Sequence, residues 1–282
     1  MEKPVHTVSL DEKTIYAYLP DNIKQHIHRF DIFNTIDSTN TYLLEQAKLN
    51  PIPKSLTHVC LAEQQMQGRG RFGKHWVSPP GHNIYLSLLH HFDKPASDLS
   101  GLSLAMGMAC ARALHQFGAA DVKLKWPNDI YFNNKKLGGI LIELESNKKH
   151  SCQVVTGIGM NIHLDPEHAA QSIQQPYTTL STMLGTAIDR NDLISLLIKE
   201  IIYAQHAFTL HGFHHFLKDW HHYDALINQP IIVHDTNGQQ KSAISQGITD
   251  KGELSVLLMP EKIKKTFNSV DVSIKLNNQD LL

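Results

Sequence analysis

The chain has 282 residues, with 26 Lys and Arg residues balanced by 27 Asp and Glu residues. This length suits one large domain, or one main domain with a small appendage, and the charge balance excludes attraction to nucleic acid or membranes by the overall field of the protein. Three widely spaced cysteines (Cys60, Cys110 and Cys152) form neither a disulfide framework nor a zinc ligand set, and the first residues lack the apolar core of a signal peptide, which together predict a cytoplasmic protein without a membrane partner.

The first part of the chain alternates short strands and helices. Asp37 or Ser38 can cap one of these helices, and an Asn-Asn-Lys turn marks a hairpin. In chain order, the pattern predicts short helices within 10–28, a strand over 30–36, a helix over 41–49, strands over 57–62 and 83–90, a helix over 99–117, a strand over 121–126, a hairpin over 129–145 and a strand over 152–163.

The second part is helical and then changes character near Asn228. Helices are predicted over 178–184, 192–210 and 213–222. From there about five short strands follow, with turns at 235–238 and 250–252, which is typical of a small barrel. We therefore expect a catalytic domain over residues 1–226, with a short helical lead-in over 1–30, and a second domain over 227–282.

A glycine-rich loop, "GRGRFGKHW", places Arg69, Arg71 and Lys74 among three glycines, with no Asp or Glu from residue 64 to residue 92. The string also matches G-x-G-x-x-G, the signature of dinucleotide binding. That fold needs a helix after the third glycine, and the Pro-Pro-Gly at 79–81 forbids one. A solvated basic turn is the ordinary alternative. The conformational freedom of the glycines and the two arginine guanidinium groups favour a mobile loop that closes over an anionic ligand.

Three later stretches place polar residues where a strand ends or where glycines expose a sheet. Each stretch also has an ordinary structural explanation: a turn for the stretch with Asn128 and Asp129, an exposed hairpin lysine for Lys136, and a β-bulge for the stretch with Gly157 and Gly159. Glycines within a strand allow a ligand to approach the sheet closely. The stretches are "KWPND" with Asn128 and Asp129, "KKLGG" with Lys136, Gly138 and Gly139, and "GIGMN" with Gly157, Gly159 and Asn161.

Five motifs in order resemble the biotin protein ligase family: "DSTN", "GRGRFGKHW", "KWPNDI", "KKLGGILIE" and "GIGMNIH". The resemblance is dense from Phe33 to about His163 and looser through "NQPIIV" and "SQGITDKGEL". It implies an α+β fold, with a class II synthetase-like catalytic domain that has a mixed central β-sheet and flanking helices. A C-terminal SH3-like β-barrel follows in this family.

The resemblance also implies a reaction in two steps. Biotin and ATP, carried as its Mg²⁺ complex, form biotinyl-5′-AMP and pyrophosphate. A lysine of the biotin carboxyl carrier protein of acetyl-CoA carboxylase then takes the biotin and releases AMP. The glycine-rich loop would be a lid that shields the acyl-adenylate from water.

The resemblance assigns roles to residues of this chain. Asp129 is the candidate for orienting or deprotonating the acceptor lysine. No metal ligand is named because Mg²⁺ is expected to be coordinated mainly by the phosphates. The catalytic set is Lys136, Arg71 and Asp129. The biotin set is Ser38, Thr39, Asn40, Gln65, Arg69, Gly70, Arg71 and Lys136. The ATP set is Arg71, Trp76, Asn128, Lys136 and Asn161.

Two other functions stay open. A lipoate or octanoate ligase of related fold would handle another carboxylate bound for a carrier lysine. A biotin-responsive DNA-binding regulator needs a winged helix ahead of the catalytic domain; residues 1–32 are too few for it, so no DNA binding is expected. A basic contact to phosphate that the family makes near its C-terminus falls on Lys275. The sequence is compatible with a homodimer but does not specify one.

Two further patterns are set aside. "GLSLAMG" around Ser103 resembles part of a nucleophile elbow but lies within a helical pattern. His211, His214 and His215 have helical spacing that could hold a metal, but no Cys or carboxylate cluster accompanies them, and a solvated helix face is the preferred interpretation.

Overall fold

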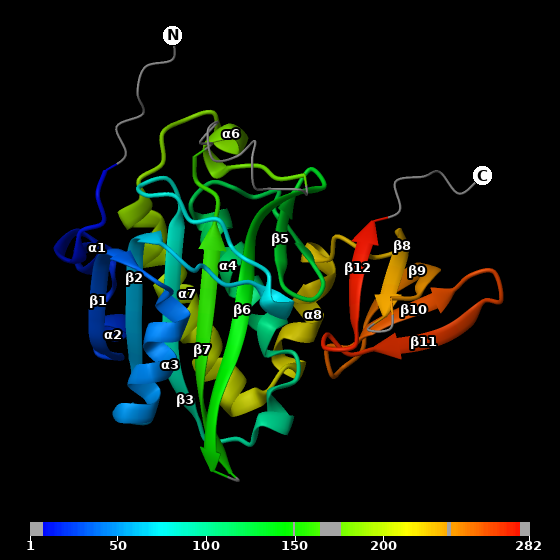
Figure 1. Cartoon of the computed structure of the whole chain (residues 1–282), viewed down its shortest axis with the longest axis horizontal. Helices are drawn as coiled ribbons and strands as arrows, with labels where there is room; N and C mark the ends of the chain where they lie inside the picture. The colour runs from blue at the N-terminus through cyan, green and yellow to red at the C-terminus, as the bar shows by residue number, and fades with distance from the viewer. Residues whose placement is uncertain (1–7, 149, 164–175, 236–237, 277–282) are drawn as a thin grey trace.

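The structure, a computed structural model, describes residues 8–148, 150–163, 176–235 and 238–276. Within these residues the larger part is built on a seven-stranded sheet in the order β1-β2-β3-β7-β6-β5-β4 (Figure 1). β1 and β2 are parallel and every other neighbouring pair is antiparallel, so the sheet is mixed as expected. The strands are β1 (Ile27–Ile36), β2 (Thr57–Gln65), β3 (Ile84–Phe92), β4 (Lys123–Lys125), β5 (Asp129–Phe132), β6 (Lys135–Lys148) and β7 (Ser151–Met160).

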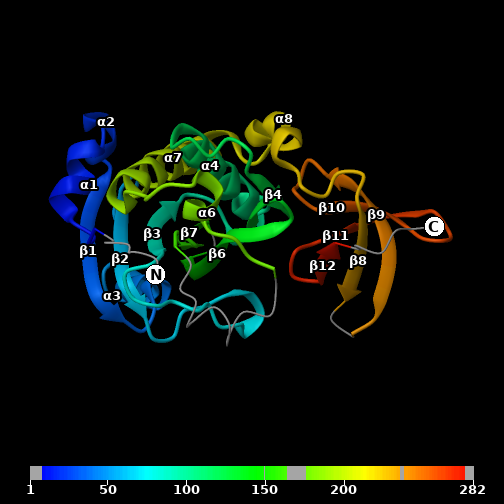
Figure 2. The same ribbon diagram turned by 90° about the horizontal axis from the view of Figure 1, so that it is seen from above.

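Helices cover the two faces of this sheet unequally. Figure 2 shows α4 and α7 packed together on one face, while α3 and the loop between β2 and β3 (cyan) lie on the other. That second face is where the sheet stays open to a ligand. The helices are α1 (Glu12–Tyr18), α2 (Asp21–Lys24), α3 (Thr39–Leu49), α4 (Leu102–Gln116), α6 (Leu180–Leu184), α7 (Arg190–His211) and α8 (His214–Tyr223).

Local chemistry explains several boundaries. The Ser38 hydroxyl accepts a hydrogen bond from Thr41 N and caps α3, as one of the two predicted caps. Asn133 and Asn134 both have positive φ, of 47° and 57°, which is the backbone of a tight two-residue hairpin turn and confirms the turn between β5 and β6. The helix predicted over 99–117 begins only at Leu102, because Gly101 ahead of it has a φ of 79°.

The C-terminal part forms a five-stranded antiparallel sheet in the order β11-β10-β9-β8-β12. In both views β12 lies on the side that faces the larger sheet (Figures 1 and 2). The predicted boundary after residue 226 stays a prediction; the first strand of the second sheet begins at Pro230. The strands are β8 (Pro230–Asp235), β9 (Gln240–Ile248), β10 (Leu254–Leu258), β11 (Ile263–Phe267) and β12 (Val272–Leu276).

Close backbone contact joins the two parts. A Cβ added to Gly252 would lie 2.9 Å from the Cα of Gly101, so a side chain does not fit between the two backbones at this point. The buried Trp126 donates its indole N–H to the carbonyl of Gly252 at 3.0 Å. The Ser100 hydroxyl donates to the carbonyl of Lys251 at 2.6 Å. These contacts hold the C-terminal sheet in a set position against the larger one, and Trp126 lies where the two sheets meet.

Helix α7 is long and apolar enough, by composition alone, to cross a membrane, with a mean hydropathy of 1.3 in its most apolar window. Of that window, 61% is buried inside the protein, where α7 packs against α4 and β3. The helix is the core helix of a packed domain.

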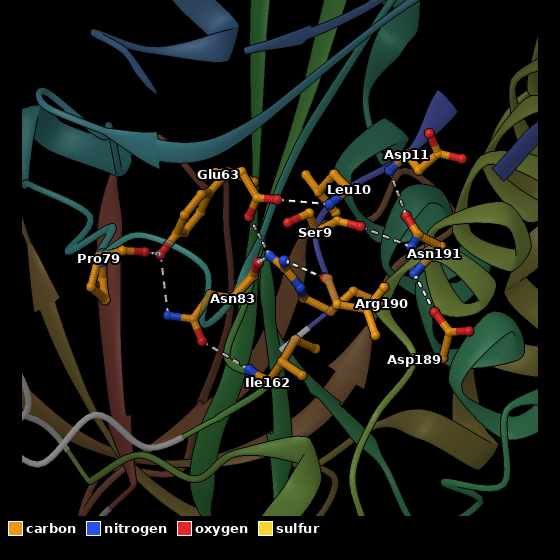
Figure 3. A network of polar contacts seen from close by, with 12 residues as sticks. Ser9, Leu10, Asp11, Glu63, Pro79, Asn83, Ile162, Asp189, Arg190 and Asn191 are labelled. Carbon is orange, nitrogen blue, oxygen red and sulfur yellow. Dashed lines mark hydrogen bonds and ion pairs between the residues drawn. The ribbon is translucent and has the colours of Figure 1, made fainter. Parts of the chain in front are cut away.

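A buried polar network ties the chain's N-terminal segment to this core (Figure 3). Arg190 is 2% exposed and donates to the Glu63 carboxylate at 2.8 Å and to the carbonyl of Val8 at 2.8 Å. Asn191 beside it accepts from the Asp11 N–H at 3.0 Å. A buried guanidinium is tolerated only when it is paired and hydrogen-bonded in this way. The network was not predicted from the sequence.

A buried histidine predicts acid sensitivity. His90 is 1% exposed, and burial, followed by the nearby His206, lowers its pKa to about 3. The unfolded chain takes up this proton near pH 6.5 while the folded protein does not, so the free energy of unfolding falls as pH drops below 6.5. At pH 4.5 the protonation of this one histidine in the unfolded chain lowers the free energy of unfolding by about 2–3 kcal/mol. Urea unfolding gives the free energy of unfolding at pH 7 and at pH 4.5. The loss of this free energy between the two pH values should be smaller for His90→Gln than for the parent protein, and equal losses would contradict the prediction.

Candidate active site

One pocket of about 530 Å³ opens on the face of the large sheet that carries α3. Its walls come from the start of α3, the glycine-rich loop, strands β3 to β7, and β12 of the C-terminal sheet. The sequence-predicted residues that line it are Ser38, Thr39, Asn40, Gln65, Arg69, Gly70, Arg71, Trp76, Asn128, Asp129 and Lys136. The structure therefore brings together residues from five separate stretches of the chain.

One end of the pocket holds neutral polar groups. The N–H of Thr39, in the first turn of α3, donates to Gln65 Oε1 at 2.9 Å. Asn40 donates through Nδ2 to Glu143 at 2.9 Å. Ser87 Oγ lies 2.6 Å from Asn40 Oδ1 and 2.7 Å from Thr39 Oγ1. This cluster offers both donors and acceptors without a net charge, which suits a neutral ligand group that has both.

Ser87 was missed by the sequence reasoning. Its signal was a lone hydroxyl in the apolar strand "IYLSLLHHF", where it is fully buried on β3. A buried hydroxyl requires a polar partner, so a polar residue inside such a strand indicates a site on that face of the sheet.

The glycines of β7 make room for two side chains of the site. A Cβ built on Gly157 would lie 2.1 Å from Asn40 Oδ1, and a Cβ on Gly159 would lie 2.4 Å from the ring of Trp76. Asn40 and Trp76 therefore rest directly on the strand backbone. The bulge that we considered as an alternative is absent from this stretch, because β7 pairs in continuous register with β3 from Cys152 to Met160. The bare sheet face expected from the alternating glycines is confirmed.

The other end of the pocket is charged. Lys136 Nζ lies 2.6 Å from Asp129 Oδ1, with only 13% and 16% of the two side chains exposed. The same Nζ lies 5.3 Å from the ring centroid of Trp76. Asp129, predicted to act on an acceptor amine, is thus paired with Lys136 in this structure, and its proposed role on the acceptor stays a prediction.

Arg71 connects the glycine-rich loop to both domains. Its guanidinium donates to Asn128 Oδ1 at 3.3 Å and to the carbonyl of Ser269, just ahead of β12. Burial lowers the pKa of Arg71, with Asp129 acting in the opposite direction. Asn128 in turn donates to the carbonyl of Ile140 at 2.8 Å. The loop therefore lies over the pocket with its second arginine turned inward.

The other arginine of the loop is placed differently. Arg69 forms an ion pair with Glu143 at 2.8 Å, and 46% of its side chain is exposed. It lines the pocket from the rim, where solvent screens its charge.

Asn161 is not among the residues that line the pocket, and its predicted place in the ATP set stays a prediction. Its amide donates to the carbonyls of Lys136, at 3.4 Å, and Thr178, at 3.3 Å. Asn161 directly follows β7, which ends at Met160. A contact of this amide with ATP would replace its contacts with these two carbonyls. In the structure, Asn161 supports the backbone of Lys136.

The residues of the two patterns set aside earlier do not line this pocket. Ser103 lies inside α4 and donates to the carbonyl of Pro127 at 3.1 Å. The rings of His211 and His215 stack 5.4 Å apart. Among the described residues, no three His, Cys, Asp or Glu side chains are placed to hold a metal ion.

The pocket is strongly cationic although the whole chain is nearly neutral. Among the described lining residues Asp129 is the sole carboxylate, and it is already paired. The cations are Arg69, Arg71, Lys74, Lys125, Lys136 and Lys275. Such a surplus is electrostatically unfavourable until an anionic ligand binds, so the pocket is built for a substrate with several negative charges.

Comparisons with known proteins agree with this geometry. Residues 32–161 match the Biotin/lipoate A/B protein ligase family. The bifunctional ligase/repressor BirA of Escherichia coli is 35% identical over 90% of this chain and 78% of its own length. The biotin–[acetyl-CoA-carboxylase] ligase of Paracoccus denitrificans is 31% identical over 77% of this chain and 90% of its own length.

A solved structure gives the same assignment. The biotin protein ligase from Aquifex aeolicus, in complex with biotin and ATP, superposes with a TM-score of 0.72 at 25% identity, covering 89% of this chain and all of that one. The pocket, the motifs and the extent of these matches lead to one conclusion: the chain belongs to the biotin protein ligase family.

Proposed function

We propose that this protein is an ATP-dependent biotin–protein ligase. In the first step a carboxylate oxygen of biotin attacks the α-phosphorus of ATP. The new P–O bond replaces the bond between the α- and β-phosphates, and pyrophosphate leaves. In the second step the ε-amine of a carrier lysine attacks the acyl carbon. A C–N bond forms, the C–O bond to AMP breaks, and the amine loses its proton.

The observation that carries this proposal is the division of one pocket into a neutral polar end and a cationic end. The neutral end, with Thr39, Asn40 and Ser87, matches a ureido ring that has one acceptor oxygen and two N–H donors. The cationic end matches a carboxylate meeting a triphosphate. Lys136 and Arg71 are placed to stabilise the charge that develops where the two meet.

The nucleotide is supported by Trp76. Its indole N–H is buried and has no hydrogen-bond partner among the described residues, and Gly159 leaves the ring room to lie flat on β7. A buried donor without a partner is costly, so a ligand acceptor beside it is favoured. Mg²⁺ would arrive with the phosphates. Asp129, the carboxylate of the pocket, is the residue that would face it.

The test is biotin-dependent exchange of labelled pyrophosphate into ATP. We expect exchange with biotin and much less with lipoate, because the neutral cluster has no counterpart in a dithiolane ring. Preferred exchange with lipoate would favour the related lipoate ligase, and no exchange with either acid by folded protein would falsify the proposal. The acceptor is proposed to be a biotin carboxyl carrier protein in the cytoplasm, and transfer to a purified carrier domain checks this.

A substitution of one glycine tests the neutral end. Gly157→Ala should weaken biotin binding at least tenfold, because the new methyl group must displace Asn40 and with it the contact to Ser87. Gly107→Ala is the matched control, since a Cβ there makes ordinary contacts of 3.5 Å in the middle of α4. Calorimetry with biotin measures both. Unchanged biotin affinity in Gly157→Ala would show that Asn40 does not contact the ligand.

A further inference from the structure

The glycine-rich loop is the middle of a longer segment, residues 66–83, that joins β2 to β3. The two ends of this segment meet at one buried guanidinium (Figure 3). Arg190 Nη1 donates to Glu63 Oε2 at 2.8 Å, on β2 just ahead of the segment, and to the carbonyl of Asn83 at 3.1 Å, the last residue of the segment. Because Arg190 is the first residue of α7, the core helix fixes both ends with respect to each other.

The second end of the segment is held by further hydrogen bonds between buried groups. The Tyr85 hydroxyl donates to the carbonyl of Pro79 at 2.9 Å and accepts from Asn83 Nδ2 at 3.2 Å. Asn83 Oδ1 accepts from the N–H of Ile162 at 2.9 Å, just beyond β7. Pro79 follows Trp76 by three residues, and Trp76 rests on β7 in the pocket. The position of Trp76 therefore depends on how this end of the segment is fixed.

These anchoring residues lie outside the pocket, since Arg190, Glu63, Asn83 and Tyr85 are not among the residues that line it. A buried ion pair is by itself weak evidence for stability, because apolar side chains of similar volume often serve as well. Its hydrogen bonds do fix the positions of the groups that they join. The glycines of the loop give its backbone wide conformational freedom, so the place where the loop closes is set by its fixed ends.

From this placement we propose that Arg190 and Tyr85 are positioning residues, which clamp the two ends of the segment so that the loop closes over the acyl-adenylate in one position. This rests on the proposed function, which supplies the adenylate. When an end is released, the open loop gains conformations that must be lost again on closure. Ordering about one further backbone residue shifts the closing equilibrium by roughly tenfold toward the open loop. An adenylate under such a loop leaves the pocket correspondingly faster.

The experiment compares Tyr85→Phe with the parent protein. This substitution keeps the ring in the core and removes only the hydroxyl that joins Pro79 to Asn83. Tyr42→Phe is the matched control, because it also removes a hydroxyl, but one that donates to Asp31 on β1 at 2.8 Å and holds no part of the segment. Urea unfolding of both variants measures how much stability each has lost.

Trypsin reports the opening of the loop directly, because Arg69, Arg71 and Lys74 are cleavage sites within it. Cleavage of a segment that opens and closes rapidly follows the population of its open form. We expect the loop of ligand-free Tyr85→Phe to be cut about tenfold faster than that of the parent protein. Biotinyl-5′-AMP should also dissociate from this variant about tenfold faster, as measured by a chase with excess unlabelled adenylate. Tyr42→Phe should behave like the parent protein in both measurements.

The double variant Arg190→Met/Glu63→Gln tests the other part of the clamp without leaving a charge unpaired. It releases both ends of the segment, so its loop should be cut faster than that of Tyr85→Phe. Parental rates of loop cleavage and adenylate dissociation in Tyr85→Phe, or equal rates in Tyr85→Phe and Tyr42→Phe, would overturn the inference. Cleavage of the ligand-free protein involves no substrate. Failure of the parent protein to catalyse biotin-dependent exchange would therefore refute the proposed function by a separate result.

Discussion

Arg71→Ala should lower the single-turnover rate of biotinyl-5′-AMP formation by about 100- to 1,000-fold, the loss seen when one donor to a developing oxyanion is removed. The guanidinium lies over the pocket between Asn128 and the carbonyl of Ser269, and burial strengthens its field. The role proposed for this guanidinium is to donate to an oxygen as negative charge develops on it. Rapid-quench measurement of the adenylate, with biotin and ATP both saturating, gives this rate.

Arg71→Lys is the control for charge alone. A lysine keeps the positive charge but loses the planar fork and the simultaneous contacts with Asn128 and Ser269, so it should recover only part of the rate. Because Arg71 joins the two domains, thermal unfolding of each variant must accompany the kinetics. A near-parental adenylation rate in Arg71→Ala would show that the loop is not an electrostatic lid.

Lys136→Ala should slow adenylation by a similar factor, about 100-fold or more, while biotin affinity falls much less. Lys136 sits at the junction of the neutral and cationic ends, between Asp129 and the ring of Trp76. A contact that forms fully only when carboxylate and phosphate meet affects the rate more than binding. Calorimetry with biotin, paired with single-turnover rates, measures the two quantities.

The partner of Lys136 complicates the single substitution, because its removal leaves the Asp129 carboxylate unpaired in the pocket. The double variant Lys136→Ala/Asp129→Asn removes that stranded charge. We expect the double variant to remain as slow as Lys136→Ala. Recovery of the adenylation rate would mean that repulsion by Asp129, and not the absence of the lysine, causes the defect.

Much of the site was predictable because its residues lie in contiguous motifs, and the amino-acid types in these motifs indicate the backbone conformation that each requires. The glycines at 157 and 159 indicated a bare sheet face, and the structure places Asn40 and Trp76 on it. The Asn-Asn turn and the Ser38 cap follow from local rules that act within four residues, and both were confirmed. Local chemistry was a reliable guide wherever the interaction partner was close in sequence.

The unpredicted features all depend on partners far apart in the chain. Ser87 on β3 meets Asn40 on α3 across 47 positions of the chain. Lys125 lines the pocket from β4, which lies beyond β5 at the edge of the sheet. The pairing of Arg190 with Glu63 spans 127 positions. The amide of Asn161 likewise donates to a carbonyl distant in sequence, that of Lys136, and its predicted role toward ATP stays a prediction.

The bulk charge was also a misleading guide to the ligand. A net charge of −1 excluded an overall attraction to polyanions, yet six cationic side chains surround one paired carboxylate in the pocket. Among the described residues, the other carboxylates do not line the pocket, although Glu143 beside it pairs with Arg69. Charge at the scale of the chain therefore says little about charge at the scale of a substrate.

One wall of the pocket is contributed by β12, at residues 273–276, and the glycine-rich loop is anchored to Ser269 just before it. During synthesis on the ribosome, the residues proposed to bind the acid and the nucleotide emerge long before this wall does. An incomplete polypeptide would thus have no closed chamber for a labile mixed anhydride, and chemistry would begin only once translation had passed the last strand.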